Sequence, residues 1–587
     1  MNTITLKTIF QLILDKKPAL IYGQIITLIA VLVSVPIPLI LPMMVDEVLL
    51  EKPAGFVETI NYFIGETNPF VYVAIVTVSV IFLRVSYYLL SAIITKIFTK
   101  ISKYVTFMIR KRLIEHLQIT SMNEYETLGS GAITSNLITD INTFDSFIMN
   151  TTSKLFSATL TLLAVSAVMI MLNPILGLMI LIIQPLNVLL SKRMSKTVGF
   201  LKKNENNSIE KFQESVGETL ELYGQIKASN KEDYFFSEAI KRADTIQKTS
   251  NEYSFKSVIY EKLSTAISLS MFEVLRASGF LLVVYSDLSI GMMFAMFGYI
   301  WFIMTPIQEM LSIQYSYASA MAALSRINKV LALQTENTGE KTIETQAVEI
   351  DLKNLDFSYA NNKPILKNVS LNIKHGSKIA LIGASGSGKT TLAQVLSGFY
   401  EKTAGTLCYN GVNTEEIDKK SLREKIFLVL QMPILFNSTL RFNITMGEEN
   451  ISDEQIHTAL KIAQLSEMTD DMQDGLQTIV GRHGIRLSGG QRQCLSIARM
   501  VIANPSVVIF DESTSALDVH TEAKLQAALL PILKDKTVIT IAHRLSTVKN
   551  ADTIYVLENG TIVQSGTHEE LEEEEGHYTE FVKNQLL

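Results

Sequence analysis

Long runs without a single charged side chain occupy the first half of this 587-residue chain. Residues 18–45 contain no Asp, Glu, Lys or Arg, and residues 155–191 form a second such run. A helix needs about 20 predominantly apolar residues to cross the hydrocarbon core of a bilayer, so the first run suffices for one crossing and the second for two. Asn173-Pro174, near the middle of the second run, predicts the tight turn of a helical hairpin. The first half is therefore expected to lie in a membrane.

Three further apolar segments, at residues 70–95, 263–285 and 288–308, bring the expected number of crossings to six. Arg84 interrupts the second crossing, and Glu273 and Arg276 lie one helical turn apart in the fifth. A charge at the centre of a bilayer costs at least about 2.5–3.5 kcal/mol on insertion scales. These side chains are therefore expected either to face a water-filled cavity of the bundle or, for Glu273 and Arg276, to pair with each other.

The distribution of basic residues predicts the orientation of the crossings, because cytoplasmic flanks carry an excess of Lys and Arg. The flanks before the first, after the second and after the fourth crossing contain Lys7, Lys16, Lys17, Lys96, Lys100, Lys103, Arg110, Lys111, Arg112, Lys192, Arg193 and Lys196. The loop at residues 46–68 instead carries several acidic residues against the single base Lys52. Both termini are expected on the cytoplasmic side.

The second half has the composition of a soluble domain, so the chain is expected to contain a transmembrane domain at residues 1–333, a polar linker at 334–347 and a soluble domain at 348–587. Residues 348–359 alternate apolar and polar side chains, as in a half-buried antiparallel strand. Residues 378–383 and 506–512 are short, continuously apolar runs, as in buried parallel strands. An α/β core follows. The net charge of -6 gives no basic footprint for nucleic acid, and Cys408 and Cys494 are too few for a disulfide framework.

A complete phosphate-loop pattern follows the first of these apolar strands and opens a helix. Backbone N–H groups of such a loop, together with the helix N-terminus, bind phosphates. Lys389 is expected to reach the terminal phosphates of a nucleotide, and the Thr390 hydroxyl to ligate Mg²⁺. The residues of this expected site are Gly383, Ala384, Ser385, Gly386, Ser387, Gly388, Lys389, Thr390 and Thr391.

Two carboxylates stand at the end of the second buried strand. Asp511 is in the right place to hold Mg²⁺, through water. Glu512 follows at the exit of the strand, where the chain can turn and direct its carboxylate at an attacking water. A second glycine-rich element, LSGGQRQ at residues 487–493, comes after a mainly helical insert in which Ser452 and Gln455 have capping-box spacing. Ser488, Gly489 and Gly490 are expected at a helix start, which suits phosphate binding.

The motifs GASGSGKTT, LSGGQRQ and VVIFDES together resemble those of the ATP-binding cassette family, and the span count resembles its exporters. The resemblance implies an α-helical six-span transmembrane domain fused to an α/β P-loop ATPase domain with a helical subdomain. It implies ATP and Mg²⁺ as cofactors. It also implies a half-transporter that dimerises, because the LSGGQ element of one chain binds the ATP of its partner; a homodimer and a heterodimer both fit.

The resemblance assigns roles to further residues. Glu512 resembles the general base, Tyr359 the aromatic that stacks on adenine, and His543 the histidine that contacts the γ-phosphate. Gln431 resembles the glutamine that senses Mg²⁺ and the membrane domain. The partner's nucleotide is expected at Ser488, Gly489, Gly490 and Gln491, and residues 515–518 resemble the loop through which the two sites communicate.

Two polar, helix-compatible stretches, at residues 123–141 and 218–232, resemble the intracellular loops of exporters that press on the nucleotide-binding domain; ordinary amphipathic loops are the alternative. The sequence departs from the family pattern at Cys494, usually basic, and at Arg482, commonly glutamate. The resemblance implies a translocating ATPase of the cell membrane, plasma or inner, that exports an amphipathic solute by alternating access. Drugs, lipids, peptides and siderophores all remain open as cargo. An importer on the same fold, for example for siderophores, and an ATP-gated channel or regulator are the alternatives.

Overall fold

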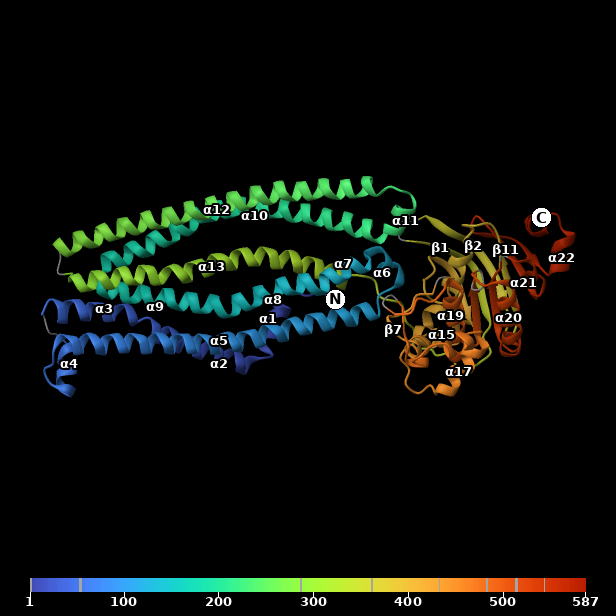
Figure 1. The fold of residues 1–587 in the computed structure, drawn as a ribbon, viewed down its shortest axis with the longest axis horizontal. Coiled ribbons are helices and arrows are strands. Elements are labelled where there is room, and N and C mark those ends of the chain that lie inside the picture. Colours follow the sequence, from blue (N-terminus) through green and yellow to red (C-terminus); the bar gives the residue numbers. More distant parts are fainter. Residues whose placement is uncertain are drawn as a thin grey trace. The chain divides into compact units, whose positions relative to one another are not determined.

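The computed structural model describes residues 3–51, 55–285, 288–359, 363–431, 433–481, 484–512, 516–542 and 544–586 (Figure 1). The chain divides into two compact units. One consists of Met1–Glu115 and Gly131–Ala332, and the other of His116–Ser130 and Leu333–Leu587.

The first unit is entirely helical, as the sequence predicts. Its α-helices are α1 (Leu6–Leu14), α2 (Lys17–Ser34), α3 (Ile40–Pro42), α4 (Gly55–Ile64), α5 (Pro69–Gln118), α7 (Ser130–Ser135), α8 (Ile141–Met149), α9 (Phe156–Leu172), α10 (Pro174–Glu221), α11 (Tyr223–Ala228), α12 (Glu232–Tyr285) and α13 (Ile290–Leu331). The helix α10 packs along α12, and α13 packs against α8 and α9 (Figure 1). At 1.5 Å per residue, the helices α5, α10, α12 and α13 are far longer than a bilayer requires.

Five helical segments among the described residues are long and apolar enough to cross a membrane. They are Lys17–Leu49, Pro69–Gln118, Gly131–Leu172, Glu232–Tyr285 and Ile290–Met310. The first four of these contain the first, second, third and fifth predicted crossings, and Ile290–Met310 overlaps the sixth, predicted at residues 288–308. The fourth prediction falls in α10, where many side chains lie outside the described ones. The predicted turn of the helical hairpin is present, because Asn173 has an extended backbone between the end of α9 and the start of α10.

Proline residues interrupt the first crossing. After α2 the chain continues through a 3₁₀ turn at Ile37–Leu39, the short α3 and a π-helical stretch at Met43–Leu49. Each proline removes one backbone donor and clashes with the preceding turn, so the closely spaced Pro36, Pro38 and Pro42 disfavour a continuous regular α-helix here. The stretch places the Asp46 carboxylate at the start of α13, where it accepts hydrogen bonds from the Ser289 hydroxyl at 2.5 Å and the Gly291 N–H at 3.0 Å.

The charged residues predicted within the crossings have different surroundings. Glu273 and Arg276 form an ion pair along α12, and both side chains remain about half exposed in the single chain, at 54% and 47%. The pairing predicted for them is therefore present, and their exposure leaves the cavity prediction for this pair untested. Arg84 on α5 is exposed.

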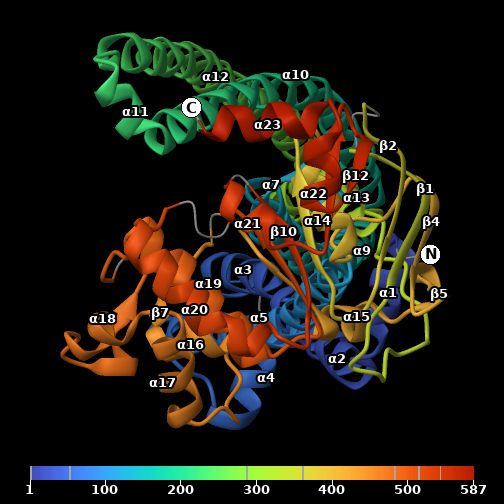
Figure 2. The same ribbon diagram turned by 90° about the vertical axis from the view of Figure 1, so that its right-hand side faces the viewer.

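The second unit contains two main sheets. The strands β1 (Ile350–Ser358), β2 (Pro364–Ile373), β4 (Ala404–Tyr409) and β5 (Val412–Asn413) form an antiparallel sheet in the order β2-β1-β4-β5 (Figure 2). The other sheet has the order β12-β11-β3-β10-β9-β6. Its strands are β12 (Thr561–Gly566), β11 (Thr553–Glu558), β3 (Lys378–Ile382), β10 (Thr537–Ile541), β9 (Val507–Asp511) and β6 (Ile426–Val429). All neighbours in it are parallel except β12, which is antiparallel to β11.

Helices cover both faces of the six-stranded sheet. On one face lies α14 (Lys389–Leu396), and on the other lie α19 (Gly489–Ala503) and α20 (Val519–Leu533). The further α-helices of this part of the chain are α15 (Lys419–Lys425), α16 (Leu440–Thr445), α17 (Asp453–Ile462), α18 (Ser466–Asp470), α21 (Leu545–Lys549), α22 (His568–Glu573) and α23 (His577–Leu586). A two-stranded ribbon of β7 (Ser438–Thr439) and β8 (Ile479–Val480) lies in the helical insert. Alternate side chains of β9 pack into the apolar cores on opposite faces of the sheet. Val507 and Ile509 pack with α14, whereas Val508 and Phe510 pack with α19 and α20. Burial on both faces explains the continuously apolar sequence of this strand. The predicted fold class is confirmed.

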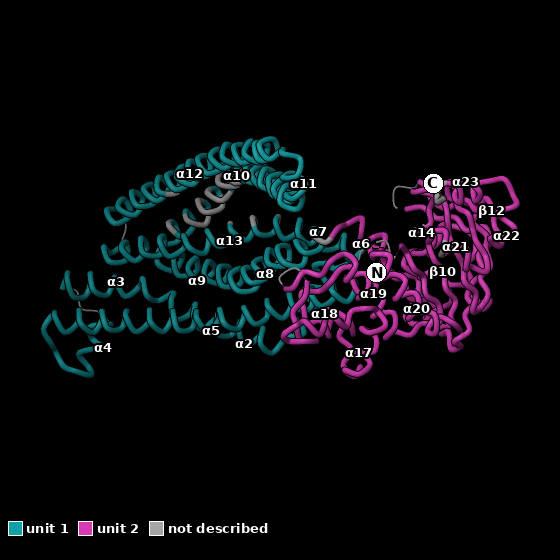
Figure 3. The backbone as a smooth tube through the Cα atoms, turned by 45° about the vertical axis from the view of Figure 1, so that its right-hand side comes forward, with its two compact units in different colours: residues 1–115, 131–332 teal, residues 116–130, 333–587 magenta. Residues whose placement is uncertain are grey.

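The segment His116–Ser130, with its helix α6 (Met122–Leu128), belongs to the second unit although it precedes most of the first in the sequence (Figure 3). Backbone hydrogen bonds hold it to the residues that follow α13: the Ser121 N–H donates to the Gln334 carbonyl at 2.9 Å, and the Glu336 N–H to the Ile119 carbonyl at 2.8 Å. The short polar helix predicted in the first intracellular loop is therefore present, and it forms part of the second unit.

Two glycines with similar backbone angles give a test of the packing in this unit. Gly560 has φ +83°, and an added Cβ would lie 2.1 Å from the Ile365 carbonyl oxygen; Gly376 has φ +75° and open space. We expect Gly376→Ala to cost about 1 kcal/mol through backbone strain alone. Gly560→Ala should lower the unfolding temperature by several degrees more, measured by scanning calorimetry of the purified protein. Equal effects of the two substitutions would contradict the close approach of Ile365.

Candidate nucleotide-binding site

The phosphate loop connects β3 to α14. Gly383 directly follows β3 and has φ +146°, and a Cβ there would lie 2.1 Å from the Leu557 carbonyl oxygen, so only glycine fits. Lys389 starts the helix, and its side chain turns back over the loop. Its ammonium group donates to the carbonyl oxygens of Gly383 at 2.9 Å and Ala384 at 3.0 Å.

The ammonium group of Lys389 lies in a desolvated position near two carboxylates. The residue is only 6% exposed. Burial lowers the pKa of Lys389, and the neighbouring carboxylates of Glu512 and Asp511 act in the opposite direction. A buried cation at a helix start, beside a loop of backbone N–H groups, is the environment that a polyphosphate requires.

Two of the three predicted metal-binding residues, Thr390 and Asp511, contact each other, whereas the side chain of the third, Gln431, bonds to Glu512. The Thr390 hydroxyl donates to the Asp511 carboxylate with 3.2 Å between Oγ1 and Oδ1, and Asp511 is 3% exposed. A hydroxyl and a carboxylate are donors that Mg²⁺ accepts, with water and phosphate oxygens completing its octahedron. Among the described residues, no group of three or more His, Cys, Asp or Glu could hold a metal ion by itself. The donor set therefore fits Mg²⁺ held jointly with a nucleotide.

The two other residues predicted near the reaction contact each other. Glu512 has a left-handed backbone, with φ +45°, which directs the chain away from the line of β9. Its carboxylate accepts a hydrogen bond from the side-chain amide of Gln431 at 2.6 Å. A non-glycine residue in this conformation costs about 1–3 kcal/mol and persists only where its surroundings hold it. Glu512 can therefore be aimed differently from Asp511, although the two are adjacent in sequence.

Tyr359, the residue expected to stack on adenine, belongs to an aromatic cluster. Its ring meets those of Phe357 and Tyr400 edge to face, with centroids 5.0 and 5.4 Å away. Its hydroxyl lies 3.2 Å from the Thr391 hydroxyl oxygen on α14. These contacts tie the ring to the helix that follows the phosphate loop.

The LSGGQ element forms the start of α19, as predicted. Ser488 is the N-cap, and a complete capping box joins it to Gln491: the Gln491 N–H donates to the Ser488 hydroxyl at 3.1 Å, and the Ser488 N–H to the Gln491 side-chain oxygen at 2.8 Å. A Cβ at Gly490 would lie 3.0 Å from the Ala516 carbonyl oxygen. Ser488 and Gln491 thus contact each other, and Gly490 lies against residues 516–517.

Three predictions fall on residues outside the described ones: His543, Ser515 and Arg482. The neighbour of the histidine is described. Arg544 forms an ion pair with Glu522, a buried carboxylate on α20. The start of α21 is therefore tied to α20 through Arg544.

One residue with several contacts in the site was missed by sequence reasoning. Gln493 on α19 is 3% exposed, and its amide group contacts the backbone of Gln431, Glu512 and Ala516. Helical spacing could have indicated it, because residues 489 and 493 share one face of the helix. A polar side chain at position 493 must therefore face the same segment of the chain that packs against Gly489.

A hydrogen bond also links the aromatic cluster to α6. The Tyr400 hydroxyl donates to the Glu126 carboxylate at 2.7 Å. Burial raises the pKa of Tyr400, and the bond to Glu126 adds to this effect. The residue therefore remains a neutral donor over the physiological range.

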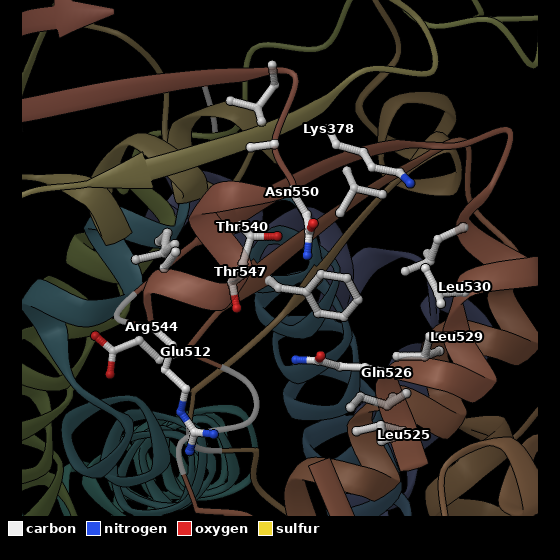
Figure 4. A pocket seen from close by; sticks show the side chains of 18 residues that line it. Lys378, Glu512, Leu525, Gln526, Leu529, Leu530, Thr540, Arg544, Thr547 and Asn550 are labelled. Atoms are coloured by element: carbon white, nitrogen blue, oxygen red, sulfur yellow. The ribbon is translucent and has the colours of Figure 1, made fainter. Parts of the chain in front are cut away.

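A cavity of about 580 Å³ lies along α20 (Figure 4). Leu525, Leu529 and Leu530 of α20 form an apolar wall, and Glu512 and Arg544 lie together at one end. None of the phosphate-loop residues lines it. It is therefore separate from the nucleotide site, although the two share Glu512.

Comparisons with known proteins match both units. Residues 20–307 match the family described as ABC transporter transmembrane region, and residues 366–515 match the family described as ABC transporter. The chain is 30% identical over 598 residues to the ATP-dependent lipid A-core flippase of Haemophilus ducreyi (strain 35000HP / ATCC 700724), covering 99% of this chain and 98% of that protein.

Two further matches agree. The chain is 30% identical over 489 residues to YgaD of Bacillus subtilis (strain 168), whose name gives it provisionally as a multidrug export ATP-binding/permease protein; the match covers 81% of this chain and 82% of that protein. The solved structure of a bacterial Atm1-family ABC exporter with ATP bound has the same fold, with a TM-score of 0.83, 22% identity and coverage of 98% and 99% of the two chains.

Proposed function

Because the chain belongs to the ABC transporter family, we propose that it is a half-transporter which pairs with a second one and exports an amphipathic solute by alternating access, driven by ATP hydrolysis. The observation that carries this proposal is the cluster of Lys389, Thr390, Asp511, Glu512 and Gln431 in a cassette fused to a membrane domain. The membrane is the cell membrane, with both termini and the cassette on the cytoplasmic side.

Each residue of the cluster has a role in ATP binding or hydrolysis. Lys389 exchanges its bonds to the loop carbonyls for the terminal phosphates, and Thr390 and Asp511 hold Mg²⁺, which neutralises phosphate charge when bound. Glu512 accepts the proton of the attacking water, and Gln431 orients that carboxylate through its amide. His543 contacts the γ-phosphate. The second chain completes the site with its own Ser488, Gly489, Gly490 and Gln491, at the start of its α19.

The named relatives indicate the direction and the kind of cargo. One relative is named as a lipid A-core flippase and another, provisionally, as a multidrug export protein. We therefore favour export over import. The exposed Arg84 and the Glu273–Arg276 pair are the polar groups in the crossings that such a cargo would meet.

Reconstituted vesicles test the function as a whole. With cassettes facing outward and ATP in the external buffer, a fluorescent amphiphile should accumulate inside the vesicles above its external concentration, because export in the cell corresponds to movement into the lumen here. Equilibration of the amphiphile without accumulation would indicate a channel, and ATP-driven loss from preloaded vesicles would indicate an importer.

The role of the base predicts the behaviour of Glu512→Gln. The amide keeps an oxygen that can accept from Gln431 but cannot take up a proton, so ATP binding should be unchanged. Steady-state hydrolysis should fall by about 10²–10⁴-fold. Nucleotide binding and phosphate release measure the two effects. The control is Glu424→Gln, an exposed carboxylate on α15, which should hydrolyse ATP normally. A Glu512→Gln variant with wild-type turnover would exclude this residue as the base.

The contact between α6 and the cassette predicts a coupling defect. Glu126→Gln replaces the charged acceptor of the Tyr400 hydroxyl with a neutral one, and a charged hydrogen bond is about twice as strong as a neutral one. Basal ATP hydrolysis should persist, whereas stimulation of hydrolysis by transported amphiphiles should fall several-fold. Glu124→Gln, on the same helix, is the matched control. Equal stimulation in both variants would show that the bond to Tyr400 does not carry the coupling.

A further inference from the structure

The side chain of Gln493 contacts three segments of the site at once. Its amide nitrogen donates to the Gln431 carbonyl at 3.0 Å and lies 3.5 Å from the Glu512 carbonyl oxygen. Its amide oxygen accepts from the Ala516 N–H at 3.1 Å. A glutamine can do all of this because a primary amide carries two donors and an acceptor. The residue lies on α19, one turn after Gly489.

These hydrogen bonds of Gln493 reach a backbone segment that has an unfavourable conformation. Glu512 has a left-handed conformation that its surroundings must maintain. Gln493 holds the main chain of both Gln431 and Glu512, whose side chains bond to each other at 2.6 Å. The same amide therefore fixes the two backbone positions from which the base and its orienting glutamine extend.

The start of α19, the helix that carries Gln493, has a different proposed function. In the proposed dimer, Ser488 and the glycines after it serve the nucleotide of the partner chain, whereas Glu512 serves the nucleotide of its own chain. Gln493 lies between these two functions and is nearly inaccessible to solvent.

We propose that Gln493 is a positioning residue for the general base of its own chain, and that it ties the orientation of Glu512 to the helix whose start binds the partner's nucleotide. The inference rests on the proposed dimer. A displacement of α19 on closure of the partner site moves the Gln493 amide, and with it the backbone of Glu512. Each site thereby receives a signal from the other through one side chain.

A pair of inactive variants isolates one working site. Lys389→Ala disables the phosphate loop, and Ser488→Arg disables the LSGGQ element. When the two chains are co-expressed with different tags and purified through both, each dimer should contain one intact site, built from the phosphate loop and Glu512 of the Ser488→Arg chain and the LSGGQ element of the Lys389→Ala chain. Recovery of hydrolysis by this pair supports the proposed function, and no recovery would count against that function rather than against Gln493.

Gln493→Met, which keeps the size of the side chain and removes its bonds, is then placed in one chain at a time. In the chain that supplies Glu512, turnover should fall about 10- to 100-fold with little change in KM, since small misplacements of a catalytic group have effects of this size. In the other chain, whose α19 start binds the same nucleotide, turnover should stay within about twofold of the parent pair.

Equal losses in both chains, or a loss confined to the chain that supplies the LSGGQ element, would overturn the proposal, because a residue that merely stabilises α19 would act through the helix start. Cys494→Ala, at the next position of the helix and buried in the apolar core, is the packing control and should leave both chains unaffected. If Gln493→Met fails to fold, Gln493→Glu in the same two positions gives the same contrast, since a carboxylate cannot donate to either carbonyl.

Discussion

The register of β10 between β3 and β9 determines where chemistry can occur in this protein. Ile541 is paired with Leu381 on one side and with Asp511 on the other, so β3 and β9 end within one residue of each other. The phosphate loop leaves the end of β3 and the two carboxylates leave the end of β9. Because carboxyl ends of parallel strands open on one edge, the cation of Lys389 and the anions of Asp511 and Glu512 meet there. A shift of one residue in either pairing would separate Thr390 from Asp511.

Much of this arrangement follows from local sequence. The phosphate loop, the buried strands and the start of α19 each depend on a few consecutive residues whose conformational preferences agree with the final fold. The hairpin at Asn173-Pro174 is of the same kind, because the turn chemistry and the length of the apolar run require it.

Other contacts could not be predicted in this way. Glu126 and Tyr400 are 274 residues apart in sequence, and nothing in the composition around either one indicates the other. The left-handed backbone of Glu512 is equally hidden, since glutamate has no preference for that conformation. Gln493 was overlooked because its partners are backbone groups, which any sequence can supply. Long-range polar contacts are set by tertiary packing and become visible only when the elements are in place.

The balance of charge in the site explains why a nucleotide should enter it together with a divalent cation. Lys389 is nearly buried and faces two carboxylates, so the cluster without nucleotide carries more negative than positive charge. A polyphosphate adds further negative charge to the same space, which would be repelled unless a divalent cation enters with it. We propose Thr390 and Asp511, which are joined by a hydrogen bond, as the residues that receive that cation, whereas the Glu512 carboxylate bonds to Gln431. In the proposed mechanism the Glu512 carboxylate takes up the proton, and the left-handed conformation from which it extends is held by neighbours such as Gln493.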